Sequence, residues 1–108
     1  MVLIINELKQ AESYKQRLIS NPSVLIEIAQ TKEDALEKIR TYSPDLILLE
    51  ISFEEEDGFK LCKEIRALHF LVRPVIVMTN HDNQDYNISI KALMSGADDC
   101  MSFQMPEQ

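Results

Sequence analysis

The sequence contains few residues of several kinds, and each shortage argues against a class of protein. Basic residues are scarce: 11 lysines and arginines stand against 18 aspartates and glutamates, and the formal net charge is −7. Non-specific binding to nucleic acid or to an anionic membrane needs a basic patch, so we expect neither contact. No apolar run approaches the roughly 20 residues that span a bilayer. Residues 1–5 lack the basic region of a signal peptide.

Cysteine is also rare, and so are the signs of a second domain. Cys62 and Cys100 are far apart in the chain and form no CxxC motif. Such thiols are typical of buried residues in a reducing cytosol, so we expect free, buried thiols and a cytoplasmic protein. The chain shows no repeat, no low-complexity segment and no linker, and its 108 residues suit one domain. We predict a single domain over residues 1–108.

Short apolar runs rich in β-branched residues recur along the chain. Such continuous runs are typical of strands that are covered on both faces, as in parallel sheets. Residues 100–103 form a weaker run than the others. The pattern predicts strands at residues 2–5, 24–28, 46–51, 75–78 and 100–103.

Helical patterns separate the predicted strands. Thr31 has the side chain of an N-cap, and Gly96 stands where a C-cap glycine belongs. Two helices are expected to turn Leu68 and Leu93, respectively, toward the core. Strands that alternate with helices imply right-handed βαβ units and a parallel sheet, in which sites lie at the carboxyl ends of strands. The helical patterns cover residues 8–20, 31–39, 57–68 and 82–95, and the strand ends are Asn6-Glu7, Glu50, Thr79-Asn80 and Phe103.

Two segments resemble the receiver domain of response regulators, a CheY-like family. They are residues 44–66, PDLILLEISFEEEDGFKLCKEIR, and residues 95–99, SGADD. The resemblance extends from Val2 to about Phe103. It implies a flavodoxin-like α/β fold: a doubly wound, five-stranded parallel sheet in the order 2-1-3-4-5. The family's final helix has no room here, so we expect a truncated domain or a natural protein without that helix. We also expect the chain to be the N-terminal part of a longer protein.

The resemblance places Glu50 where the family carries its phosphoacceptor aspartate, and Asn6 and Glu7 where it carries an acidic pair for Mg²⁺. Asn6 supplies no carboxylate, so Glu7 and Glu50 remain only weak candidate ligands for Mg²⁺. Glu50 is one methylene longer than aspartate, and misplacing an attacking atom by about 1 Å can cost about 10²-fold in rate. Two interpretations stay open. Glu50 mimics an aspartyl phosphate by its charge, or it is a solvated strand-end carboxylate without a signalling effect.

Three further positions bear on the same chemistry. By resemblance, Thr79 is the hydroxyl residue of the family's switch, Cys100 replaces its aromatic partner, and Phe103 replaces the family's lysine. Phenylalanine cannot supply an ammonium donor. The changes at the acceptor, the lysine and the switch together predict a pseudo-receiver that is not an enzyme and has no catalytic residues.

We therefore expect a phosphorylation-independent regulatory module in two-component, phosphorelay-type signal transduction. By resemblance it would act by protein–protein contact through the surface of residues 88–101. The expected partners are a histidine kinase, an output domain in the same chain, or a second copy in a homodimer. Two alternatives remain: a genuine phosphoacceptor that uses Glu50 and Mg²⁺, and a small-ligand-binding domain with Met78, Cys100 and Phe103 as an apolar lining.

Overall fold

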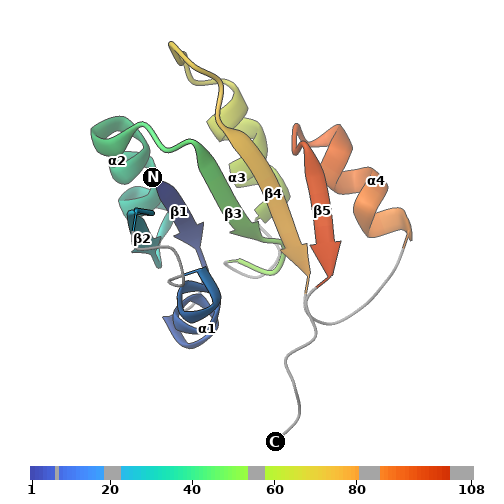
Figure 1. Ribbon diagram of the computed structural model, residues 1–108. Coiled ribbons are helices and arrows are strands. Elements are labelled where there is room, and N and C mark those ends of the chain that lie inside the picture. Colours follow the sequence, from blue (N-terminus) through green and yellow to red (C-terminus); the bar gives the residue numbers. More distant parts are fainter. Residues whose placement is uncertain (7, 19–22, 54–57, 81–85, 103–108) are drawn as a thin grey trace, which may run out of the picture.

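Strands and helices alternate along the chain (Figure 1). The computed structural model describes residues 1–6, 8–18, 23–53, 58–80 and 86–102. The strands are β1 (Val2–Ile5), β2 (Ile26–Ala29), β3 (Leu46–Glu50), β4 (Val75–Asn80) and β5 (Asp99–Ser102). The helices are α1 (Leu8–Leu18), α2 (Lys32–Tyr42), α3 (Gly58–Arg66) and α4 (Tyr86–Met94).

The strands form one parallel sheet in the order β2-β1-β3-β4-β5, which confirms the predicted topology. Local signals for two helix ends are also confirmed. The Thr31 side chain accepts a hydrogen bond from the Asp34 amide at 3.1 Å, as an N-cap does. Gly96 follows α4 with a φ of 107°, a conformation that glycine adopts without steric cost. No helix of the described residues is long and apolar enough to cross a membrane.

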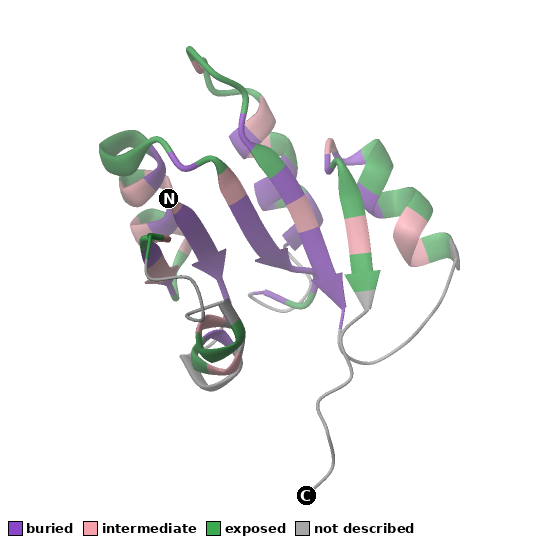
Figure 2. Ribbon diagram, in the orientation of Figure 1, coloured by how far each residue is buried: buried purple, intermediate pink, exposed green. Residues whose placement is uncertain are grey.

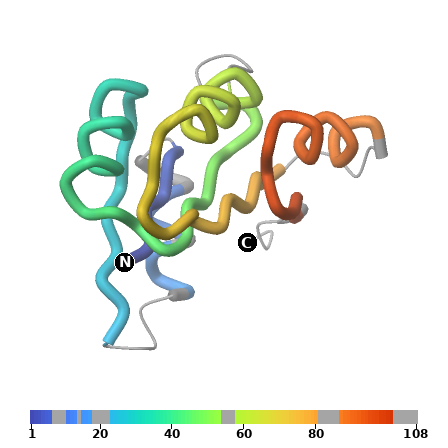
Figure 3. The backbone as a smooth tube through the Cα atoms, turned by 90° about the horizontal axis from the view of Figure 1, so that it is seen from above, coloured from blue at the N-terminus to red at the C-terminus, as the bar shows by residue number. Residues whose placement is uncertain are grey.

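The sheet lies between two unequal layers of helices. Figures 1 and 3 show α2, α3 and α4 on one face and α1 on the other. The face toward α2 and α3 carries the larger cluster of buried side chains, and the smaller cluster includes Ala11 of α1. Burying each aliphatic side chain contributes about 1.5–3 kcal/mol, so both clusters stabilise the sheet. The strand side chains of the larger cluster include Leu3, Ile5, Ile47, Leu49, Ile76 and Met78.

Several expectations from helical spacing need correction. Leu68 lies beyond the end of α3 and is 37% exposed, and Leu93 on α4 is 53% exposed. Helix α4 packs at the edge strand β5, so it buries Ala92 while much of its surface faces solvent (Figure 2). Cys62 is buried as predicted, but Cys100 is only half-buried because β5 is an edge strand.

Asp98 joins three segments at the amino-terminal edge of the sheet. Its carboxylate pairs with Arg66 of α3 and with Arg73, and it accepts a hydrogen bond from the Ile76 amide at 2.9 Å. Arg66 also donates to the carbonyl oxygens of Gly96 at 2.6 Å and Pro74 at 2.8 Å. The end of α3, the start of β4 and the turn before β5 are therefore held together by one polar cluster.

This cluster leads to a prediction on pH. Burial raises the pKa of Asp98, but the Ile76 amide and the charges of Arg73 and Arg66 outweigh it and hold the pKa below its ordinary value of 3.8. A carboxyl whose pKa is lower in the folded state stabilises the fold above its unfolded pKa, and this contribution is lost as pH falls through the folded pKa. We expect Asp98→Asn to lower the free energy of unfolding by about 1–2 kcal/mol at neutral pH. The effect should be smaller near pH 3, because the stabilisation by the ionised carboxyl begins to decline once the pH is below the unfolded pKa. Urea unfolding at both pH values measures this, and an equal loss at both would contradict the assigned ion pairs.

Candidate functional site

Glu50 is a buried acidic residue at the carboxyl end of β3. Glu50 is 2% exposed. Thr79, which pairs with Glu50 in the register of β3 and β4, is 1% exposed. The Thr79 hydroxyl donates to Glu50 Oε2 at 2.8 Å, and the Ser52 hydroxyl donates to Oε1 at 3.3 Å. Burying a carboxylate is costly unless hydrogen bonds compensate it. The interpretation of Glu50 as a solvated carboxylate is therefore wrong.

The chain turns directly after Glu50, and this turn encloses the carboxylate. The Ile51 amide donates to the Thr79 carbonyl at 2.9 Å, and the Phe53 amide donates back to the Glu50 carbonyl at 3.1 Å. Ile51 and Phe53 are both buried. Helix α3 then begins at Gly58, where an added Cβ would lie 2.5 Å from the Glu50 carbonyl oxygen. The absence of a side chain at Gly58 thus lets α3 begin against the end of β3.

The other strand ends complete the site only in part. Asn6 follows β1 and is buried. Glu7 and Phe103 lie outside the described residues, as does the place of a final helix. Within the part of the chain that the structure describes, no group of three His, Cys, Asp or Glu residues could hold a metal ion. Mg²⁺ is commonly held by one or two carboxylates together with water molecules, so Glu50 and Glu7, the latter outside the described residues, stay only candidate ligands.

Cys100 lies on β5, beside the site and away from its centre. Its register partner on β4 is Met78, whereas Thr79 pairs with Met101. Burial raises the pKa of the Cys100 thiol; a hydrogen bond with Ser89 of α4 opposes this rise, and the negative charges of Asp99 and Glu50 add to it. The thiol is therefore protonated at neutral pH. It offers a small side chain where the resemblance would place an aromatic ring.

Some residues of the site were not singled out from the sequence. Ser52 stands only two positions after Glu50, and a hydroxyl so close to the strand end could have marked Ser52 as a hydrogen-bond partner of Glu50. Asn80, which the sequence placed with Thr79 at a strand end, is buried at the end of β4. The Lys91 ammonium lies 4.6 Å from the centre of the Phe59 ring and links α4 to the start of α3. That contact joins distant segments, so no local pattern predicts it.

Comparison with known proteins gives a consistent match. The family model of the response regulator receiver domain matches residues 2–107. Among curated proteins, the chain is 28% identical over 101 residues to the alkaline phosphatase synthesis transcriptional regulatory protein PhoP of Bacillus subtilis, covering 94% of the chain and 41% of PhoP. It is 39% identical over 71 residues to the transcriptional regulatory protein AfsQ1 of Streptomyces coelicolor, covering 66% of the chain and 30% of AfsQ1. The chain therefore spans less than half the length of these relatives.

Solved structures show the same similarity. The signal receiver domain of a DNA binding response regulator from Colwellia psychrerythraea matches with a TM-score of 0.82 and 24% identity, over 94% of this chain and 83% of that one. A two-component response regulator from Clostridium difficile matches with a TM-score of 0.76 and 31% identity, over 99% of this chain and 84% of that one. The sheet and helices described above are thus those of a receiver domain.

Proposed function

Because the chain belongs to the response regulator receiver domain family, we propose that it is a pseudo-receiver that regulates by protein–protein contact without accepting a phosphoryl group. The observation that carries the proposal is the state of Glu50. Both carboxylate oxygens accept hydrogen bonds, from Thr79 and Ser52, and the residue is 2% exposed. A nucleophile must reach its target with the correct geometry, so a buried carboxylate that two hydroxyls hold in place is poorly placed for attack.

The proposed role of Glu50 is to hold the strand-end residues in one arrangement. Its negative charge stands in a buried position and engages the Thr79 hydroxyl permanently. No phosphorylation step is then needed to bring Thr79 toward β3. In this proposal Glu50 is a constitutive substitute for the charge that phosphorylation would supply.

The proposed contact surface lies on α4. Much of α4 is exposed (Figure 2). Ile90, Leu93 and Met94 are 55%, 53% and 80% exposed, which leaves an apolar surface on this helix. Contiguous exposed apolar side chains mark protein interaction sites. We propose that this surface binds a histidine kinase, an output domain of a longer chain, or a second copy of the domain. The chain spans only 41% of PhoP and 30% of AfsQ1. This supports the proposal that it is one domain of a longer protein.

Intact mass after incubation with acetyl phosphate and Mg²⁺ tests the proposal. We expect no added phosphoryl group on the wild-type chain, because Glu50 is enclosed and extended by one methylene. The matched control is the double variant Glu50→Asp, Phe103→Lys, which restores the family's residue types at both positions. Uptake by this variant alone would show that the fold still permits the chemistry and that the natural residues prevent it. Stoichiometric uptake by the wild-type chain would refute the pseudo-receiver proposal.

A further inference from the structure

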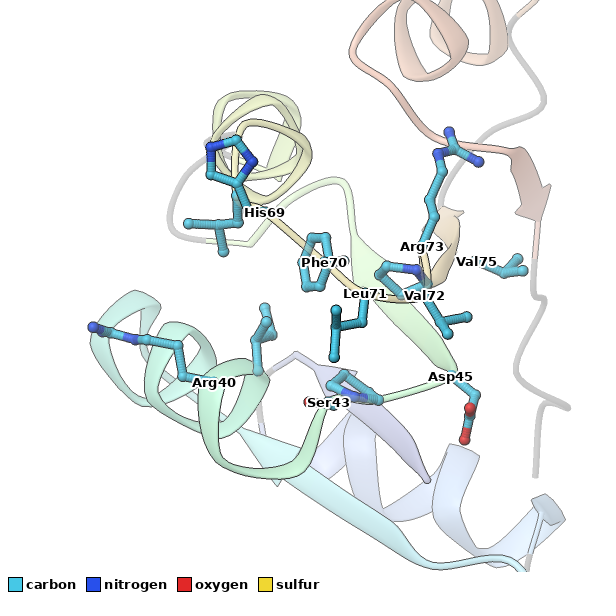
Figure 4. Close-up of a pocket in the computed structure, with 13 residues that line it drawn as sticks. Arg40, Ser43, Asp45, His69, Phe70, Leu71, Val72, Arg73 and Val75 are labelled. Atoms are coloured by element: carbon cyan, nitrogen blue, oxygen red, sulfur yellow. The ribbon is translucent and has the colours of Figure 1, made fainter.

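A groove of about 840 Å³ opens at the amino-terminal edge of the sheet, the edge opposite Glu50. It lies between the end of α2 and residues 68–74, the segment that joins α3 to β4 (Figure 4). Leu71 points across the groove toward Ser43 in this view. The lining includes Ile39, Arg40 and Pro44 on one wall and Phe70, Leu71 and Val72 on the other.

The groove is bordered by aliphatic side chains that face solvent. Leu71 is fully exposed, Val72 is 80% exposed, and Leu68 and Val75 are 37% and 47% exposed. Single exposed aliphatic residues are ordinary, but these four line one depression. A contiguous apolar surface of this kind is typical of a site that binds another molecule.

The rim of the groove is basic in an acidic protein. The chain carries 18 acidic residues, yet none stands between Glu64 and Asp82. Arg40, His69 and Arg73 line the groove, and Asp45, the one acidic residue among its described lining residues, is paired with the amino group of Met1 at 2.6 Å. Among the residues that the structure describes, Arg40 takes part in no ion pair. The charge of Arg40 is therefore available to an anionic group of a ligand.

Hydrogen bonds fix the two walls of the groove. The Val75 amide joins them by donating to the Asp45 carbonyl at 2.9 Å, and Arg66 of α3 fixes the wall of residues 68–74 by donating to the Pro74 carbonyl at 2.8 Å. On the wall formed by the end of α2, the Ser43 amide caps the helix by donating to the Ile39 carbonyl at 3.0 Å. A preformed site loses less conformational freedom on binding than one that must first become ordered.

We propose that this groove docks a segment of a partner protein in which apolar side chains are interspersed with carboxylates. The apolar side chains lie over Leu71 and Val72, and a carboxylate pairs with Arg40. A protein segment fits better than a small molecule, because small-molecule sites enclose most of the ligand whereas Leu71 stands entirely in solvent. The surface is distinct from the α4 surface and does not depend on whether Glu50 accepts a phosphoryl group.

A random-peptide phage library, selected on the whole chain and read out with synthetic copies of the enriched peptides, tests this proposal. We expect the enriched peptides to combine apolar residues with aspartate or glutamate. Their affinity should fall at least about tenfold for Leu71→Asp and for Arg40→Glu. Both positions are exposed, so the variants should fold, which circular dichroism checks. Leu25→Asp, a change of the same kind at a residue that is 55% exposed elsewhere on the surface, should leave the affinity unchanged.

The proposal would be overturned by selection of no peptide, by enrichment of peptides without carboxylates, or by peptides whose affinity is insensitive to Leu71→Asp and Arg40→Glu. Peptides that lose affinity equally with Leu25→Asp would show general adhesion to apolar surface. Self-association of the wild-type chain that Leu71→Asp abolishes would assign the groove to a second copy in place of a partner.

Discussion

Replacing Gly58 by alanine is expected to lower the free energy of unfolding by about 3 kcal/mol, at the upper end of the usual cost of overpacking. An added Cβ would lie 2.5 Å from the Glu50 carbonyl oxygen and 2.7 Å from the Ile51 carbonyl oxygen. Both atoms belong to the backbone that forms the turn after β3, so no flexible side chain can move aside. The start of α3 must shift away from the sheet, and the packing of Phe59 shifts with it.

Thermal and urea unfolding measure this effect, which corresponds to a fall of roughly 12–24 °C in Tm for a domain of this size. Lys60→Ala is the matched control, because Lys60 is exposed on the same helix and its replacement should change stability by at most about 0.5 kcal/mol. If Gly58→Ala were as stable as the wild-type chain, the close approach of α3 to the end of β3 would be incorrect.

Thr79→Val is expected to lower the free energy of unfolding by about 2 kcal/mol. Valine has the shape of threonine but no hydroxyl, so the change removes the 2.8 Å hydrogen bond to Glu50 without leaving a cavity. The carboxylate stays buried with one donor fewer, and a hydrogen bond to a charged group contributes more than an average hydrogen bond does. Thr79→Ser keeps the hydroxyl and should lose only about 0.8 kcal/mol for one methyl group.

A double-mutant cycle separates the hydrogen bond from the effects of shape. When both partners are made apolar, in Thr79→Val with Glu50→Leu, the polar groups disappear together and the double variant should be more stable than Thr79→Val alone. Equilibrium unfolding of the four proteins measures the coupling. If the effects of Thr79→Val and Glu50→Leu were additive, the two side chains would not interact, and the proposed role of Glu50 would lose its support.

Much of the fold follows from local patterns. The apolar runs at 2–5, 46–51 and 75–78 became strands within two residues of the predicted ends, because a continuous apolar run is stable only when both faces of a strand are covered. The run at 24–28 became β2 at Ile26–Ala29, and Leu25 is exposed before it. Pairing with β1, which no single run encodes, sets where β2 begins.

The sequence predicted where the candidate site lies, but not that Glu50 is buried there. The alternation of strands and helices brings the carboxyl ends of β1, β3 and β4 to one edge, and so it brings Glu50 and Thr79 together. That Glu50 does not face solvent could not be predicted locally: the Thr79 hydroxyl, 29 positions away, donates to its carboxylate, and Ile51 and Phe53 in the following turn are themselves buried. The contributions of Glu7 and Phe103 remain predictions.

The sequence by itself determined the alternation of strands and helices along the chain, the parallel sheet and the place of Glu50 and Thr79 at its carboxyl edge, because these depend on spacing along the chain. Only the tertiary structure decided that Glu50 is enclosed, that Leu68 and Leu93 face solvent, and that Leu71 and Arg40 border one groove. Burial is a property of segments that are distant in sequence and meet in space, so no periodicity within one segment specifies it.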